Sequence, residues 1–210
     1  MRPLILIGGG GHCKSVIDVA ESAGFTILGV LDKQDKVGHD ILGYQVIGTD
    51  DNIPDYADKA EFVITVGQIK NTHIRRRIAD NVKIAGGTLA TIIANDAYVS
   101  RHAQVGEGTV VLHHAFVNAG ARIGINCIIN TMANIEHDVR VGDFCHISTG
   151  TMVNGEVQIG NDVFIGSQSV IANGVTVGNN TIIGAGSCVM KSVCGNGMYY
   201  GNPATLKIKP

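Results

Sequence analysis

The chain has 210 residues, and its 16 Lys and Arg residues against 18 Asp and Glu residues leave a net charge of −2. This balance, with no basic block, argues against non-specific nucleic-acid binding and an electrostatic membrane anchor, and no apolar run approaches the ~20 residues of a membrane span. The N-terminus lacks a signal-peptide pattern, and the five cysteines form no C-x-x-C pair. We therefore expect a cytoplasmic protein with reduced thiols and no membrane insertion.

The first part of the chain predicts a small α/β domain. The expected elements are a strand over 3–7, a helix over 14–23, strands over 25–31 and 61–66, and a basic helix over 72–81. This alternation is typical of a Rossmann-like βαβ domain with a parallel sheet. We place the domain at residues 1–82.

A glycine-rich loop follows the first predicted strand, in the stretch ILIGGGGHCKS at residues 5–15. It nearly matches both the P-loop and the dinucleotide fingerprint, but Cys13 stands where each motif needs a further glycine. Strand carboxyl ends converge on one crevice in a parallel sheet, where loop N–H groups can meet phosphates. The loop therefore predicts a nucleotide site without indicating an NTPase or a dehydrogenase.

A six-residue period governs the second part of the chain. Every sixth residue from Ile93 to Val189 is valine or isoleucine, and the residue two positions earlier is usually small. This is the hexapeptide period of a parallel β-helix, in which three short strands make one coil of about 18 residues. We place the β-helix at residues 83–190 and an irregular tail at 191–210. Cys127 and Cys145 occupy the small position, where we expect them only to pack.

The two parts together resemble the sialic-acid and bacillosamine-type sugar acetyltransferases, the NeuD/PglD group. The resemblance rests on Gly10-Gly11-His12, Asn130, Glu136-His137-Asp138, His146 and Gly201-Asn202-Pro203-Ala204. It implies a left-handed β-helix, acetyl-CoA as co-substrate, no metal, and a homotrimer with active sites between subunits. It also implies N-acetylation of a nucleotide-linked 4-amino-4,6-dideoxy sugar during polysaccharide or glycan synthesis.

The catalytic candidates lie in one hexad. His137 comes two residues after Ile135 and so falls off the aliphatic ladder, where interior packing would not explain it. With the resemblance, this predicts a general base that acts with direct acetyl transfer. Asp138 is the expected supporting carboxylate, with Glu136 as the alternative. Gly155 lies one coil further on, and its N–H is the expected donor to the thioester oxygen.

The resemblance assigns further residues to the two substrates. Those implied to contact acetyl-CoA are His146, Gly155, Ser167 and Ala185. Those implied to bind the nucleotide are Gly10, Gly11, His12, Asp32, Lys33 and Gly67, while Asn130 is implied to contact the sugar. Lys207 or Lys209 in the tail could meet CoA phosphates.

Three other functions stay open at this point. A sialic-acid O-acetyltransferase would share the same fold, although the glycine-rich loop favours a nucleotide sugar. Zinc carbonic anhydrases also use hexapeptide β-helices, and His113, His114, His137 and His146 lie in this repeat. They do not show an H-x4-H spacing. A non-catalytic nucleotide-binding protein is the third alternative.

Overall fold

The computed structural model describes residues 2–207. The chain forms two compact units: the chain up to Gly67 together with His73–Asn95, and Gln68–Thr72 together with the chain from Asp96 onward. The boundary expected at residue 82 stays a prediction. Within the described range, no helix combines the length and apolar character that crossing a bilayer requires.

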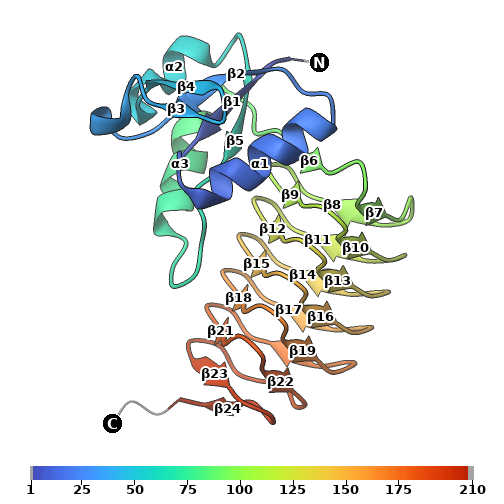
Figure 1. The fold of residues 1–210 in the computed structure, drawn as a ribbon. Coiled ribbons are helices and arrows are strands. Elements are labelled where there is room, and N and C mark those ends of the chain that lie inside the picture. Colours follow the sequence, from blue (N-terminus) through green and yellow to red (C-terminus); the bar gives the residue numbers. More distant parts are fainter. Residues whose placement is uncertain (1, 208–210) are drawn as a thin grey trace. The chain divides into compact units, whose positions relative to one another are not determined.

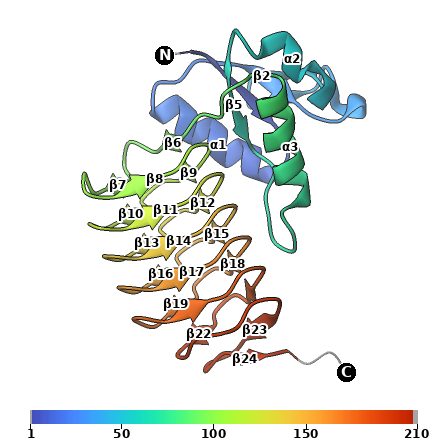
Figure 2. The ribbon, with the colours of Figure 1, turned by 180° about the vertical axis from the view of Figure 1, so that it is seen from behind.

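The first unit contains a five-stranded sheet in the order β3-β4-β2-β1-β5. The helices and strands of this unit are β1 (Leu4–Ile7), α1 (Gly11–Ser22), β2 (Ile27–Leu31), β3 (Asp40–Ile41), β4 (Tyr44–Gly48), α2 (Ile53–Tyr56), β5 (Glu61–Ile64), α3 (His73–Ile84) and β6 (Ile92–Ile93). β1 pairs in parallel with β2 and β5, β4 pairs in parallel with β2, and β3 is antiparallel to β4. Figures 1 and 2 show α1 on one face of this sheet and α3 on the other. The predicted Rossmann-like domain is confirmed.

Two local features of this unit differ from the sequence prediction. Helix α1 begins at Gly11 rather than at residue 14, because glycines carry a low helix propensity and hide its start. The β3–β4 hairpin was not predicted. Its turn places Leu42 and Gly43 at φ 52° and 89°, and leucine is an uncommon residue in that left-handed region.

The second unit is a parallel β-helix, built mostly of two-residue strands that stack coil on coil (Figure 1). Sheet 1 contains β7 (Tyr98–Val99), β10 (Phe116–Val117), β13 (Asn134–Ile135), β16 (Met152–Val153), β19 (Val170–Ile171) and β22 (Cys188–Val189). Sheet 2 contains β8 (Gln104–Val105), β11 (Arg122–Ile123), β14 (Arg140–Val141), β17 (Gln158–Ile159) and β20 (Thr176–Val177). Sheet 3 includes β9 (Val110–Val111), β12 (Ile128–Ile129), β15 (His146–Ile147), β18 (Phe164–Ile165), β21 (Ile182–Ile183), β23 (Met198–Tyr200) and β24 (Thr205–Leu206).

The interior of the β-helix follows the predicted period. The second residue of every strand from β9 to β22 is buried, and Ile147, Val153 and Ile165 are fully buried. The small positions form a second buried column, in which the Sγ atoms of Cys127 and Cys145 approach the carbonyl oxygens of Gly142 and Gly160 at 3.1 and 3.0 Å. Burial raises the pKa of the Cys145 thiol, as expected for a packing residue.

Candidate functional site

The predicted base lies at the corner between sheets 1 and 2, where the chain passes from β13 to β14. Nδ1 of His137 and Oδ2 of Asp138 are 3.0 Å apart, and the two side chains are 53% and 64% exposed. Asp138 has a φ of 60°, a left-handed conformation that aspartate tolerates better than most residues. We call this region, with Gly155 one coil further on, the His137 corner.

The hydrogen-bond partners in this hexad distinguish the two candidate carboxylates, Asp138 and Glu136. The hydrogen bond to Asp138 is the largest cause that raises the pKa of His137 above its ordinary 6.5. Glu136 instead accepts hydrogen bonds from Asn118 Nδ2 at 2.7 Å and Asn134 Nδ2 at 3.1 Å, which lower its own pKa. The geometry therefore favours Asp138 as the partner and gives Glu136 a structural place in a polar stack.

Gly155 lies directly against the predicted base. A Cβ atom at this position would stand 2.6 Å from His137 Nε2 and 2.7 Å from Cε1, closer than any side chain allows. Among the described residues, no group accepts a hydrogen bond from the Gly155 N–H. An unbonded backbone N–H on the residue next to the predicted base is the kind of donor that a developing oxyanion needs.

Gly120 is a feature of this corner that the sequence analysis missed. It lies one coil before Asp138 at φ 77°, and a Cβ there would collide with Asp138 Oδ1. The 18-residue length of one coil could have predicted this contact. It places residue 120 one coil before residue 138, just as it places residue 155 one coil after residue 137.

A second group of predicted residues lies near the corner between sheets 3 and 1. His146 is 8% exposed, and its Nδ1 lies 2.7 Å from the backbone oxygen of Gln68. Its Nε2 lies 3.0 Å from Asn130 Nδ2, while Asn130 Oδ1 accepts a hydrogen bond from the Thr131 N–H. These partners fit a neutral imidazole with its proton on Nδ1. We call this region the His146 corner.

The other residues predicted to contact acetyl-CoA extend along the same corner. Ser167 Oγ is 2.9 Å from Ser148 Oγ, and Ala185 is exposed one coil further on. Lys207 places its Nζ 5.7 Å from the centre of the Tyr200 ring, and Lys209 lies outside the described residues. One chain therefore presents the predicted base and the other predicted acetyl-CoA contacts at two different corners of the β-helix.

The nucleotide residues predicted in the first unit come together around one cavity of about 890 Å³. It lies at the carboxyl ends of β1, β2 and β5, as expected for a parallel sheet. The predicted residues that line it are Gly10, Gly11, His12, Asp32, Lys33 and Gly67. Its volume falls within the range of small-molecule pockets. Asn130, predicted to contact the sugar, belongs instead to the β-helix unit.

Asp32 orders the glycine-rich loop at this cavity. Its Oδ2 accepts a hydrogen bond of 3.0 Å from the Gly9 N–H, and its Oδ1 accepts one of 2.8 Å from the Lys33 N–H. A Cβ at Gly9 would stand 2.6 Å from Asp32 Oδ2, so the loop needs glycine here. The cavity is also lined by Thr49, Asp50 and Arg77, which the sequence analysis did not identify.

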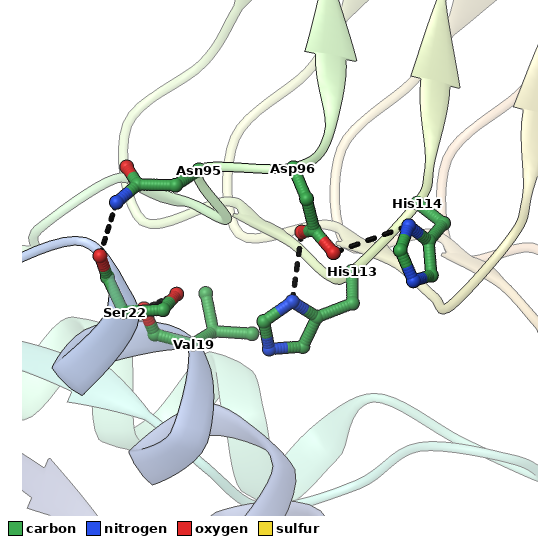
Figure 3. A network of polar contacts seen from close by, with 6 residues as sticks. All are labelled: Val19, Ser22, Asn95, Asp96, His113 and His114. Atoms are coloured by element: carbon green, nitrogen blue, oxygen red, sulfur yellow. Dashed lines mark hydrogen bonds and ion pairs between the residues drawn. The ribbon is translucent and has the colours of Figure 1, made fainter.

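His113 and His114 form a separate cluster with Asp96 (Figure 3). Asp96 lies between them, with Oδ1 at 2.7 Å from His113 Nδ1 and Oδ2 at 3.1 Å from His114 Nδ1. In the part of the chain from residue 2 to 207, no three His, Cys, Asp or Glu side chains are arranged to hold a metal ion. The zinc alternative therefore finds no ligand set among these residues.

Comparison with known proteins supports the same family from both ends of the chain. Residues 3–82 match the PglD N-terminal domain, and residues 156–191 match the bacterial transferase hexapeptide with six repeats. An uncharacterized protein of Acanthamoeba polyphaga mimivirus is 36% identical over 105 residues. That match covers 49% of this chain and spans only 20% of the viral protein.

Solved structures match this chain over nearly their whole length. A histidine variant of perosamine N-acetyltransferase from Caulobacter crescentus, in complex with CoA and GDP-perosamine, is 30% identical with a TM-score of 0.93, covering 100% of this chain and 98% of that one. The acetyltransferase domain of PglB from Neisseria gonorrhoeae, in complex with acetyl coenzyme A, is 32% identical with a TM-score of 0.90, covering 98% and 99%. The chain therefore belongs to the PglD-type family of hexapeptide-repeat sugar acetyltransferases.

Proposed function

We propose that this protein transfers the acetyl group of acetyl-CoA to the amino group of a nucleotide-linked 4-amino-4,6-dideoxy sugar. The observation that carries the proposal is the His137 corner, where the imidazole that contacts Asp138 lies against Gly155, whose N–H has no acceptor among the described residues. The similar Caulobacter enzyme, crystallised with CoA and GDP-perosamine, and the PglB domain, crystallised with acetyl coenzyme A, support both substrates.

The geometry fits direct transfer. His137 donates from Nδ1 to Asp138, which leaves Nε2 free to take a proton from the attacking amine. The amine nitrogen bonds to the thioester carbon while the Gly155 N–H stabilises the negative charge on its oxygen. The C–S bond then breaks, and the imidazolium returns the proton to the CoA sulfur. No covalent enzyme intermediate is required.

The acceptor's nucleotide part would occupy the cavity of the first unit. The backbone N–H groups at the N-terminus of α1 and in the preceding glycine loop suit a diphosphate. Gly10 precedes α1 and provides no side-chain cap, so a ligand can reach the first N–H groups of the helix. A free sialic acid offers no such diphosphate, so the cavity favours a nucleotide sugar over it.

The active site would be completed in a homotrimer. Sheet 1 joins the His137 and His146 corners, and its outward side chains include the exposed residues Tyr98, Met152 and Val170. The outward positions of sheet 2 include Arg122 and Arg140, which are exposed and charged. The outer face of sheet 1, which lies between the two corners, is therefore apolar and suits contact with a second subunit. In such an assembly the His146 corner of one subunit would lie beside the His137 corner of the next. Light scattering should give three times the 22.0 kDa of one chain, and a monomer with full activity would contradict this assembly.

The proposed activity can be tested by CoA release with a panel of acceptors. The panel pairs UDP-, dTDP- and GDP-linked 4-amino-dideoxy sugars with free and CMP-linked sialic acid. Turnover on an amino sugar that is lost in His137→Ala is expected. Turnover only on sialic acid would instead assign O-acetylation and overturn the proposed acceptor.

A further inference from the structure

The end of β4 forms one wall of the nucleotide cavity. Thr49, Asp50 and Asp51 follow this strand and line the cavity. The carboxyl ends of the strands follow the sheet order, with β5 and β1 beside the glycine loop, then β2 at Asp32, then β4 at Asp50. The two strands beyond the loop are therefore placed to meet successive parts of a bound nucleotide.

If the ligand is a nucleotide, as proposed, the order of the strand ends along the cavity sets the order in which they meet its diphosphate, ribose and base. The diphosphate fits the glycine loop and the N-terminus of α1. An acidic residue at the end of the second strand of a βαβ unit is the usual partner of a ribose hydroxyl, and Asp32 occupies that place. The next strand end along the edge is that of β4, so the base would reach Asp50.

The Asp50 carboxylate can still accept hydrogen bonds from a ligand. It is half-buried, and burial is the main cause that raises its pKa, although the charge of Arg77 partly opposes the shift. Asp50 and Arg77 form no direct ion pair, and among residues 2–207 no group donates a hydrogen bond to the Asp50 carboxylate. An ionised carboxylate only accepts hydrogen bonds, so its natural ligand is a pair of adjacent N–H groups.

We propose that Asp50 makes this cavity selective for a guanine nucleotide. Guanine presents N1–H and the N2 amino group side by side, and both can donate to the two oxygens of one carboxylate. Uracil and thymine present a single N3–H between two carbonyl oxygens, which would face the carboxylate with like charge. Adenine offers its amino group beside a ring-nitrogen acceptor. The proposal rests on the proposed function and names the base of its acceptor.

The test is the binding of GDP, UDP, dTDP and ADP to the full-length protein by isothermal titration calorimetry. We expect GDP to bind at least ~10-fold more tightly than the other three, because a site built to bond N–H groups leaves them unmatched in the wrong base. In Asp50→Asn this preference should fall by ~10-fold or more. Asp58→Asn removes the same charge from an exposed residue outside the cavity and should keep the preference.

The outcomes separate the base assignment from the proposed function. Tight binding of all four diphosphates without preference, or an unchanged preference in Asp50→Asn, would overturn the role of Asp50 alone. An equal loss for every base in that variant would also overturn it. Failure of the wild-type protein to bind any nucleoside diphosphate would overturn the nucleotide-sugar acceptor and the base assignment with it. The wild-type preference is measured without any variant, so a poorly folded Asp50→Asn protein cannot hide the answer.

Discussion

The two units place their candidate residues by different physical means. In the β-helix, a fixed 18-residue coil sets residues beside one another, so Gly155 lies against His137 and Gly120 beneath Asp138. In the first unit, unrelated loops meet because parallel strands end at one edge, so Asp32 reaches Gly9 across 23 positions of sequence. The β-helix thus carries the candidate acid–base chemistry, and the first unit carries the candidate binding pocket. Changes in the two units should therefore alter different kinetic constants.

The largest effect is expected from loss of the base. His137→Ala removes the group that would take the amine proton, and general acid–base catalysis is worth about 10²–10⁴-fold. We expect kcat to fall by about 10³-fold while the acceptor KM changes little. The measurement is steady-state CoA release, with His102→Ala, another exposed histidine, as the matched control. A similar loss in the control variant would argue against a specific role for His137.

A methyl group beside the base should be nearly as harmful. Gly155→Ala places a Cβ against Nε2 and Cε1 of His137, so the ring must move. A displacement of about 1 Å in a reacting group can cost about 10²-fold in rate, and we expect a loss of that size in kcat. Asn173→Ala changes an exposed residue one coil further on and should keep its rate. Equal activity of both variants would remove Gly155 from the site.

The first unit should respond through binding. Asp32→Ala removes the acceptor of the Gly9 and Lys33 N–H groups, and hydrogen bonds to charged groups contribute about 1.5–3 kcal/mol. We expect the KM for the nucleotide sugar to rise about tenfold or more, with little change in the KM for acetyl-CoA. Asp35→Ala, an exposed carboxylate in the same loop, is the control. A selective rise in the KM for acetyl-CoA would reverse the assignment of the two units.

The smallest effect is a shift in pH dependence. Asp138 raises the pKa of His137, and the base acts only when it is neutral, so activity should rise with pH through this raised value. In Asp138→Asn the acid limb of kcat/KM should move to lower pH, and the plateau should fall by about tenfold because the weaker base accepts the proton less readily. Glu136→Gln should shift the limb less, since Glu136 bonds Asn118 and Asn134. An unshifted limb in Asp138→Asn would separate Asp138 from the titration.

The sequence predicted the β-helix better than the first unit, and the reason is physical. In a six-residue period, each position of the hexad has the same structural environment in every coil. Because Ile135 is an interior ladder residue, His137, two residues later, is predicted to lie at a corner. No such rule governs the cavity of the first unit, whose β4 wall depends on a hairpin turned through Leu42 and on a short helical turn after Thr49. Asp50 and Arg77 join that wall only through tertiary packing, which no local pattern records. The loop Gln68–Thr72, which reaches His146 through its backbone, was likewise invisible to periodicity.

The most direct test of this account is single-turnover transfer from acetyl-CoA labelled in its acetyl group. We predict that the label passes to the amide of the nucleotide-linked amino sugar without appearing on the protein, and that His137→Ala shows almost no transfer in the same time. Label that accumulates on the protein before it reaches the sugar would contradict direct transfer. Transfer by His137→Ala at the wild-type rate would contradict the role of His137 as the base.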